Sequence, residues 1–431
     1  MILINFTITF VDKYNSSYLM KTKNLALLLF ITFLLSSCAS HYYERNNFKY
    51  PEPVDTQNKK IDFQDKKTYQ IGHIFADNQF DGARLNGFKQ INDSTYLVNI
   101  SPENTPINTS PWYAFKIWSD TVQQIYLQLH YTYGKHRYLP KISSDRKYWK
   151  KIDAEKLILN KDKTTATFPL LIKKDTTWVA GEEIINTSDI QDWINSLKAN
   201  PLTHNFTTAG TSVLGKNIPF FRIGKDESTG KKAIVLMSRQ HPPEISGFIA
   251  FQRFIEAILQ SDKNTDRFFN EYDIWVFPVL NPDGVDLGHW RHNARGVDLN
   301  RDWAYYRQPE TDAVTKFIVN QAKKHQNKVV LGIDFHSTYK DIYYTYDQSF
   351  HTNLSDFTPK WIASIDRAVA PFKTKTSPEA LSKAFSKTWF YKQFKAESIT
   401  YEVGDETPRE FIKRKAEIAA RNMIKFLLED M

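Results

Sequence analysis

The chain has 431 residues and a formal net charge of +9, with 57 lysine and arginine residues against 48 aspartate and glutamate residues. A chain of this length can form two domains, or one large α/β domain with additions. The basic residues are spread along the chain among acidic ones, and we find none of the short sequence signatures of nucleic-acid-binding domains. We therefore expect a globular protein that does not bind nucleic acid.

The only cysteine, Cys38, ends a segment with the layout of a secretory signal. Two lysines precede an apolar run over residues 25–35, which is shorter than the roughly 20 residues of a membrane span. The sequence LSSC, residues 35–38, resembles the lipobox of bacterial lipoproteins, in which the cysteine becomes the lipidated first residue. We expect residues 20–38 to be a lipoprotein signal peptide that starts at Met20.

Two other interpretations of this segment are an uncleaved N-terminal anchor and a signal that is cut without lipidation. All three predict export, and the first prediction places the protein on a membrane through a lipid on Cys38. After lipidation the mature chain has no free thiol, so disulfides and cysteine-ligated zinc are excluded. Any metal ion must then be bound by histidine and carboxylate side chains.

Two kinds of sequence follow the signal. Residues 39–66 are polar, contain two prolines close together and have no sustained hydrophobic period, which is typical of a linker. Residues 67–190 hold short alternating runs, such as QQIYLQLHYTY, where Ile125, Leu127 and Leu129 fall on one face of a strand. Several such strands joined by turn-rich segments predict an antiparallel β-sandwich domain.

Residues 191–431 alternate between strands and helices. Four runs are apolar enough to be strands buried on both faces: KAIVLMS (232–238), YDIWVFPVL (272–280), KVVLGIDF (328–335) and ESITYEVG (397–404). Amphipathic helical spacing lies between them, as in GFIAFQRFIEAILQ (247–260). The alternation predicts an α/β domain with a mixed, largely parallel sheet that helices cover on both faces.

Polar side chains follow several of these strands. His241 and Glu244 stand just after the first run, His336 just after the third and Glu402 near the end of the fourth. In open α/β sheets, ligands bind at the carboxyl ends of the strands, so these groups should gather at one edge. The same His-x-x-Glu spacing at residues 41–44 lies in the polar linker, where no predicted strand end brings other polar side chains close to it.

Two histidines and one glutamate form an established zinc-binding set that leaves one position for water. Zinc lowers the pKa of that water towards ~7, and a nearby carboxylate can take its proton as the water attacks a carbonyl. A His-x-x-Glu match alone is expected by chance, and His336 alone is also compatible with a buried histidine that bonds to the backbone. Their shared position is what indicates a metal site.

Five motifs, in this order, resemble those of the zinc metallocarboxypeptidase family of the carboxypeptidase A type: HPPE (241–244), NPDG (281–284), RHNARGVDLNRDW (291–303), DFHS (334–337) and ITYEVG (399–404). The resemblance covers about residues 200–431. The preceding block, especially SPWYAFKIWS (110–119), is similar to the N-terminal domain of the cytosolic carboxypeptidase-like branch. The resemblance implies hydrolysis of C-terminal peptide bonds by a zinc-activated water.

The resemblance also implies a role for each matching residue. It places one zinc ion per chain on His241, Glu244 and His336, and it makes Glu402 the general base that later protonates the leaving amine.

Four residues of the longest motif receive roles in the same way. Arg291 matches the arginine that stabilises the oxyanion, a contribution of ~3 kcal/mol for such a donor. Asn300 and Arg301 match the pair that holds the C-terminal carboxylate of the substrate, a task suited to a planar guanidinium. Asp298 is expected to orient a zinc-binding histidine from behind.

The sequence departs from the family pattern at the active-site tyrosine. Residues 386–402 align without gaps, and the same register puts Ala380 where the family has a mobile tyrosine. Either the loop is reshaped, or another donor such as Lys383 or Tyr391 replaces the phenol.

The same register places Lys387 at the floor of the side-chain pocket. A buried ammonium group is costly unless it is paired. We therefore expect an acidic partner in the substrate, and hence release of C-terminal Glu or Asp. The alternative is a register error of one residue that turns Lys387 out to solvent.

Three functions remain open from the sequence. The first is a membrane-tethered carboxypeptidase that acts on the C-terminal tails of peptides or proteins. The second is an amidase or peptidase that acts on cell-wall peptides, because related zinc enzymes cleave such amides. The third is a surface lipoprotein that binds peptides without turnover, for which the missing tyrosine is the only support.

Overall fold

The computed structural model describes residues 42–260, 262–347, 349–354 and 356–429. Cys38 and the predicted signal peptide lie outside these residues, so the lipoprotein prediction stays a prediction. The chain divides into two units, residues 1–46 and 47–431, and all elements described below belong to the second unit. Among the helices of the described residues, none has a stretch that is both long and apolar enough to cross a lipid bilayer.

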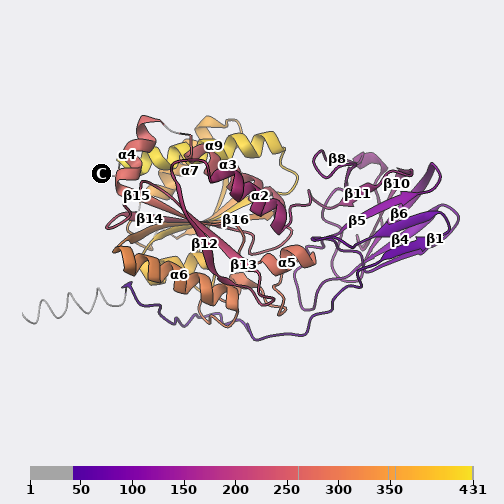
Figure 1. Ribbon diagram of the computed structural model, residues 1–431, viewed down its shortest axis with the longest axis horizontal. Helices are drawn as coiled ribbons and strands as arrows, with labels where there is room; N and C mark the ends of the chain where they lie inside the picture. Colours follow the sequence, from indigo (N-terminus) through magenta and orange to yellow (C-terminus); the bar gives the residue numbers. More distant parts are fainter. Residues whose placement is uncertain (1–41, 261, 348, 355, 430–431) are drawn as a thin grey trace, which may run out of the picture. The chain divides into compact units, whose positions relative to one another are not determined.

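The first part of the second unit is made of short strands. They are β1 (Thr68–Ile71), β2 (Ile74–Asp77), β3 (Gly87–Gln90), β4 (Thr95–Ile100), β5 (Ala114–Ser119), β6 (Gln123–Tyr131), β7 (Lys141–Ser143), β8 (Lys150–Lys151), β9 (Ile158–Leu159), β10 (Thr165–Ile172) and β11 (Thr177–Ala180), with a 3-10 turn, η1 (Ala154–Lys156), before β9. They form two sheets, in the orders β1-β2-β5-β11-β7-β8 and β3-β4-β6-β10-β9 (Figure 1). We call this part the sandwich domain.

The core of the sandwich domain follows from the alternation in its sequence. Ile125, Leu127 and Leu129 of β6 are buried in one cluster with side chains of both sheets, while Gln124 before them and Tyr126 between them are exposed. The prediction of an N-terminal β-sandwich is therefore confirmed. The strand pairs are antiparallel apart from β4 and β6, which pair in parallel.

The remaining elements form the α/β domain. They are α2 (Thr187–Leu197), β12 (Thr203–Thr211), β13 (Asn217–Ile223), β14 (Lys232–Ser238), α3 (Ile245–Ile258), α4 (Lys263–Glu271), β15 (Tyr272–Phe277), α5 (Pro282–Leu287), η2 (Leu299–Arg301), α6 (Pro309–His325), β16 (Lys328–Thr338), β17 (Ile342–Tyr346), α7 (Phe357–Ala368), β18 (Lys375–Glu379), α8 (Ser386–Phe394), β19 (Glu397–Gly404) and α9 (Arg409–Glu429).

One sheet runs through this domain in the order β12-β13-β15-β14-β16-β19-β17-β18. The four central strands β15, β14, β16 and β19 are parallel. The pairs β12–β13, β13–β15 and β17–β19 are antiparallel, and the edge pair β17–β18 is parallel. Helices α3, α7 and α9 lie on one side of the sheet and α6 on the other (Figure 1). The predicted α/β fold with a mixed, largely parallel sheet is confirmed.

Helix α3 shows why the sheet is covered as it is. Its apolar residues recur at helical spacing, and Phe248, Phe251, Phe254 and Ile255 are all buried in the main core cluster.

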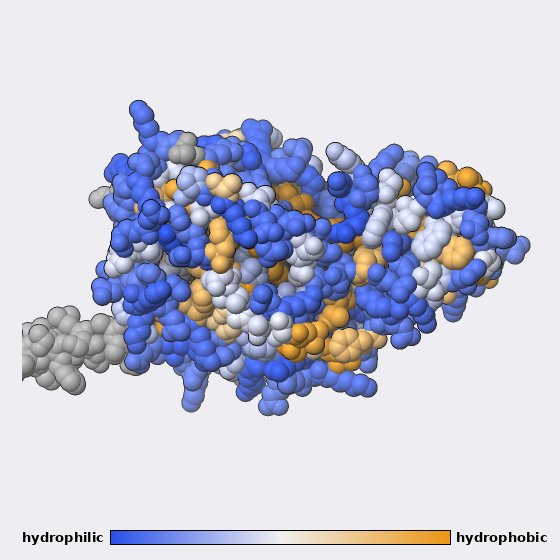
Figure 2. Space-filling model, in the orientation of Figure 1, coloured by the Kyte–Doolittle hydropathy of each residue, from blue (hydrophilic) through white to orange (hydrophobic). Residues whose placement is uncertain are grey.

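On the face of the molecule seen in Figure 2, hydrophilic side chains predominate, as they do on the surface of a globular protein.

The end of the predicted linker packs on the α/β domain. Residues 47–66 form no helix or strand, yet the backbone N–H of Glu52 donates to the Ser382 carbonyl at 3.0 Å, and that of Lys59 donates to the Arg295 carbonyl at 2.9 Å. This stretch is therefore part of the folded protein.

Candidate active site

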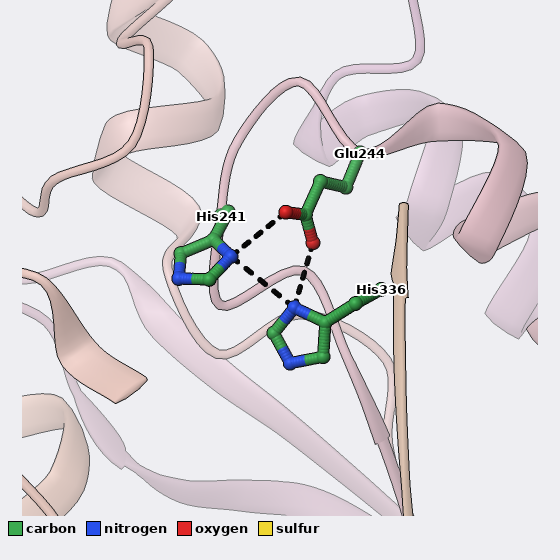
Figure 3. Close-up of side chains that lie close together, drawn as sticks. All are labelled: His241, Glu244 and His336. Carbon is green, nitrogen blue, oxygen red and sulfur yellow. Dashed lines mark hydrogen bonds and ion pairs between the residues drawn. The ribbon is translucent and has the colours of Figure 1, made fainter. Parts of the chain in front are cut away.

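Three side chains at the carboxyl edge of the sheet form a compact group, which we call the metal cluster: His241, Glu244 and His336 (Figure 3). The two carboxylate oxygens of Glu244 lie 2.8 Å from Nδ1 of His241 and 2.7 Å from Nδ1 of His336. The two Nδ1 atoms are 3.2 Å apart. All three residues are buried, and in the described residues no other group of histidine, cysteine or carboxylate side chains has such spacing.

The local backbone brings these residues together. His241 and Glu244 lie between the end of β14 and the start of α3, while His336 is still within β16, which pairs in parallel with β14. Helix α3 begins directly against β16, because a Cβ atom on Gly247 would lie only 2.3 Å from the carbonyl oxygen of His336. Only glycine allows this approach, which places Glu244 within reach of both imidazoles.

A carboxylate lies behind each imidazole. Asp298 Oδ1 is 3.0 Å from Nε2 of His241, and Asp334 Oδ2 is 2.9 Å from Nε2 of His336. Carboxylates in this position orient the ring and leave the other nitrogen for a metal ion. The sequence predicted this place for Asp298 but assigned no role to Asp334.

The electrostatics of the metal cluster favour a cation. Burial opposes the ionisation of Glu244, but His241 and His336 outweigh it and lower the pKa of this carboxyl group. For His336, burial lowers the pKa, yet Asp334 and Glu244 raise it well above the usual value for histidine. Two imidazole nitrogens and a carboxylate oxygen surrounded by further carboxylates are therefore a donor set that suits zinc.

Glu402 lies beside the metal cluster on the neighbouring strand. In the pairing of β16 with β19, its Cα atom is opposite that of His336. Its Oε2 atom is buried and has no hydrogen-bond partner among the described residues. Burial and the nearby Glu244 carboxylate raise the pKa of Glu402. A partnerless carboxylate oxygen next to a metal site is suited to accept a proton from water.

A cavity of about 450 Å³ opens on the metal cluster. It collects most of the residues predicted from the sequence motifs: His241, Glu244, Arg291, Asn300, Arg301, His336 and Glu402. Asp298 lies behind His241 and does not line the cavity, and Lys387 does not line it either.

The two arginines and the asparagine are held in place by neighbouring groups. Arg291 Nε donates to Asp298 Oδ2 at 2.7 Å, and Arg301 Nη1 lies 3.6 Å from the same oxygen. The side-chain oxygen of Asn300 accepts from the backbone N–H of Ser386 at 2.9 Å, which leaves its NH₂ group to donate to another molecule. The three side chains thus present donors to the cavity.

The environment of Lys387 differs from the expectation. The lysine is buried, but its Nζ donates to the Thr345 carbonyl at 2.8 Å and lies 3.0 Å from Oε2 of Glu379. The premise of an ammonium group that lacks a partner is therefore wrong, and so is the alternative of a lysine turned to solvent. The residue that lines the cavity is Glu379, and register alone could not reveal it.

The residues considered in place of the missing tyrosine lie in two different parts of the structure. Lys383 lines the cavity, whereas Ala380 and Tyr391 lie together in a different surface pocket. Two tyrosines that the sequence analysis did not single out, Tyr339 and Tyr344, also line the cavity.

Strand alternation explains the position of Tyr344. On β17, Tyr343 is buried in the core, so the next side chain points to the opposite face. The Cα partner of Tyr344 is Thr400, two residues before Glu402 on β19, and Thr400 also lines the cavity. The alternation in IYYTY was the signal that could have identified this residue.

The sandwich domain contributes to the cavity wall as well. Asn108, Thr109, Ser110 and Arg137 line it. Arg137 Nε donates to Asp405 Oδ2 at 2.8 Å. No local pattern in the sequence predicts these contacts, because they join segments that are far apart in the chain.

An α/β sheet with a buried His-Glu-His cluster at its carboxyl edge is the arrangement of a zinc-binding protein. The family model described as zinc carboxypeptidase matches residues 190–423, more than half of the chain. The chain therefore belongs to the zinc carboxypeptidase family.

Named relatives agree with this assignment. The chain is 29% identical over 182 residues to human Cytosolic carboxypeptidase 2, a match that covers 40% of this chain and only 20% of that protein. It is 23% identical over 288 residues to Cytosolic carboxypeptidase 6 of Caenorhabditis elegans, covering 62% of each chain. The chain thus spans about a fifth of the first relative and less than two thirds of the second.

Solved structures share the fold. A metallo-carboxypeptidase from Burkholderia cenocepacia matches with a TM-score of 0.67 at 17% identity, covering 82% of this chain and 98% of that one. A metallo-carboxypeptidase from Pseudomonas aeruginosa, solved in complex with (2-guanidinoethylmercapto)succinic acid, also matches with a TM-score of 0.67 at 17% identity, covering 82% and 99%. The coverage includes both the sandwich and the α/β domain.

Proposed function

We propose that the protein is a zinc-dependent metallocarboxypeptidase that removes the last residue of a peptide chain. The observation that carries this proposal is a single cavity with a His-Glu-His cluster, a partnerless carboxylate oxygen and donors for a substrate carboxylate. Zinc, when bound at the metal cluster, supplies an acidified water and polarises the carbonyl group that the water attacks.

The side chains around the cluster divide the remaining tasks. Glu402 takes the proton of the attacking water and passes it to the leaving amine, since its Oε2 has no other partner. Arg291 donates to the oxygen that gains negative charge. The NH₂ group of Asn300 and the guanidinium of Arg301 bind the C-terminal carboxylate. Asp298 orients the metal-binding imidazole in front of it.

We also propose a preference for acidic C-terminal residues. Arg301, Lys383 and Glu379 line the cavity, the charge of Glu379 is offset by Lys387 at 3.0 Å, and Lys383 lies 3.2 Å from a carboxylate oxygen of Glu52. An acidic side chain in this part of the cavity, which we call the pocket end, would meet the ammonium group of Lys383. Lys387 contributes to this preference by neutralising Glu379, and not as an unpaired charge at the floor of the pocket.

The substrates in this proposal are the C-terminal tails of peptides or proteins. Ser110 and Arg137 of the sandwich domain line the cavity, so a chain that reaches the metal cluster must pass between two domains. The sequence of residues 20–38 supports export and a membrane anchor at Cys38.

Zinc analysis and peptide hydrolysis test the proposal together. Purified protein should contain about one zinc ion per chain, lose peptidase activity on chelation and recover it when zinc is returned. Less than about half an equivalent of zinc, with cleavage that a chelator does not affect, would contradict the proposal.

Substrate comparison tests the finer parts. Peptides identical except for a C-terminal Glu, Leu or Lys should be cleaved fastest at Glu. Faster release of Leu or Lys would rule out the acidic preference and leave the carboxypeptidase intact. Purified muropeptides in a parallel incubation distinguish peptide trimming from hydrolysis of cell-wall amides.

A further inference from the structure

The segment that carries Arg291, which we call the arginine loop, comprises residues 288–298 between α5 and η2. Its backbone is held by one carboxylate of the sandwich domain. Glu103 accepts the N–H groups of three consecutive residues: Trp290 at 2.8 Å, Arg291 at 2.9 Å and His292 at 2.7 Å. Glu103 follows β4 and lies almost two hundred residues earlier in the chain.

Glu103 is fully buried, and its surroundings keep it ionised. Burial alone would raise the pKa of this carboxyl group, but His289, Arg84 and His292 together with the backbone N–H groups lower it. A buried carboxylate that accepts several backbone N–H groups is a strong and directional anchor.

Further contacts from the sandwich domain hold the rest of the arginine loop. Arg84 Nε donates to the Gly288 carbonyl at 2.7 Å, and the side-chain NH₂ of Asn104 donates to the Gly296 carbonyl at 3.0 Å. At the first of these sites a Cβ atom on Gly288 would lie 2.2 Å from the carbonyl oxygen of Ala83, so the two backbones touch.

Arg291 is thereby fixed at both ends. Its own N–H group is bound by Glu103, and its guanidinium is bound by Asp298 at 2.7 Å. A long side chain loses much conformational freedom when it binds a transition state, and fixing it beforehand removes part of that cost. Donors placed in advance are what makes stabilisation of a developing oxyanion effective.

We propose that Glu103 is a positioning residue for Arg291, so that the sandwich domain supplies part of the active site. This inference rests on the proposed function, in which Arg291 binds the oxyanion. It predicts that a change at Glu103 alters turnover more than substrate binding, because Asn300 and Arg301 bind the ground state as well as the transition state.

The decisive variant is Glu103→Gln. The amide has one acceptor oxygen, so it cannot accept all three N–H groups, and its own NH₂ must face one of them. We expect kcat to fall about 10- to 100-fold with a KM change below about threefold, at unchanged zinc content. Affinity for a phosphonate peptide, which mimics the tetrahedral intermediate, should fall by a similar factor in calorimetry.

The matched control is Glu182→Gln. Glu182 is an equally buried carboxylate after β11, and it pairs with Lys141 at 2.9 Å and with Arg409 of the α/β domain. It therefore also joins the two domains, but it touches neither the arginine loop nor the cavity. This variant should keep the kcat and phosphonate affinity of the unmodified protein, whatever it does to stability.

Arg291→Ala completes a double-mutant cycle. If Glu103 acts through Arg291, the change at Glu103 should cost little further activity once Arg291 is alanine. Additive losses, a kcat of Glu103→Gln within twofold of the unmodified protein, or a loss that follows the zinc content would each overturn the inference.

Two further measurements separate a failure of this inference from a folding defect and from a failure of the proposed function. If Glu103→Gln does not fold, Glu103→Asp keeps the charge and shifts the arginine loop, and it should lower kcat with normal zinc content; an unchanged kcat refutes the inference. If the unmodified protein hydrolyses no peptide, the proposed function fails instead.

Discussion

The two ends of the cavity are built in different ways. At the metal end, His336 and Glu402 lie opposite each other on adjacent parallel strands, and the pairing of these strands determines which side chains meet. At the pocket end, Glu379 closes β18, while Lys383 and Phe385 come from the irregular segment before α8. Strand register therefore determines which side chains meet at the metal end. At the pocket end, the side chains are positioned by the local course of an irregular segment.

Charge is also balanced differently at the two ends. The metal end holds several carboxylates around two imidazoles and needs a cation to balance them. The pocket end already contains its own pair, Lys387 with Glu379, at 3.0 Å. Substitutions at the metal end should therefore abolish peptide hydrolysis, whereas substitutions at the pocket end should change which C-terminal residue is released.

The largest expected effect comes from Glu402→Gln. The amide keeps the shape of the side chain but cannot accept the proton of water, so kcat should fall at least about a thousandfold. Zinc content and the thermal midpoint should stay close to those of the unmodified protein, measured by metal analysis and calorimetry. Activity within tenfold of normal would remove Glu402 from the mechanism.

An intermediate effect is expected from Lys387→Met. This change leaves the Glu379 carboxylate without its buried partner, so the pocket end becomes more negative than in the unmodified protein, and we expect release of C-terminal Glu to fall about tenfold or more relative to Lys. Competition between peptides ending in Glu and Lys measures the ratio.

Lys387→Met with Glu379→Gln serves as the control for the pocket. It removes both charges, and it should restore much of the stability lost in the single variant, because no half-buried carboxylate is left without its partner. An unchanged Glu-to-Lys ratio in the single variant would show that this pair does not govern specificity, and the contrast between the ends would break down.

The smallest effect concerns a second carboxylate beside the arginine loop. Glu310 accepts from the side-chain NH₂ of Asn293 at 3.0 Å, and burial raises its pKa from 4.5 to about 7. The folded protein therefore keeps this proton to a higher pH than the unfolded chain. The stabilisation is complete below pH 4.5 and is lost as the pH rises through about 7.

Glu310→Gln, which mimics the protonated form, should remove this dependence. Between pH 4.5 and 7.5, the unfolding free energy of the unmodified protein should fall relative to the variant by about 1–3 kcal/mol. Urea unfolding at both pH values gives the difference. A difference in unfolding free energy between the two proteins that is independent of pH would mean that Glu310 is ionised, like Glu103, which binds the same loop.

The sequence predicted the metal end well and the pocket end poorly. His241, Glu244, His336 and Glu402 each stand at a strand end, where short motifs and the geometry of parallel sheets bring them together. The partner of Lys387 depends on how residues 379–387 turn between two elements, which no periodic pattern encodes.

Contacts between segments that are far apart in the chain also could not be predicted from the sequence. Glu103 and Arg137 come from the sandwich domain, and no local pattern marks a carboxylate that will meet three N–H groups far along the chain. Asp334 belongs to the DFHS motif, but its contact with His336 depends on the direction of the side chain as well as on spacing, so the motif alone does not predict its role.

The contact at Gly288 bears on how this protein can evolve. With no room for a Cβ atom between that residue and the carbonyl of Ala83, the two surfaces must change together. A sandwich domain recombined from a distant relative would have to arrive with its own matching arginine loop. We therefore expect a side chain at position 288 to be accepted only together with a change in the backbone around Ala83.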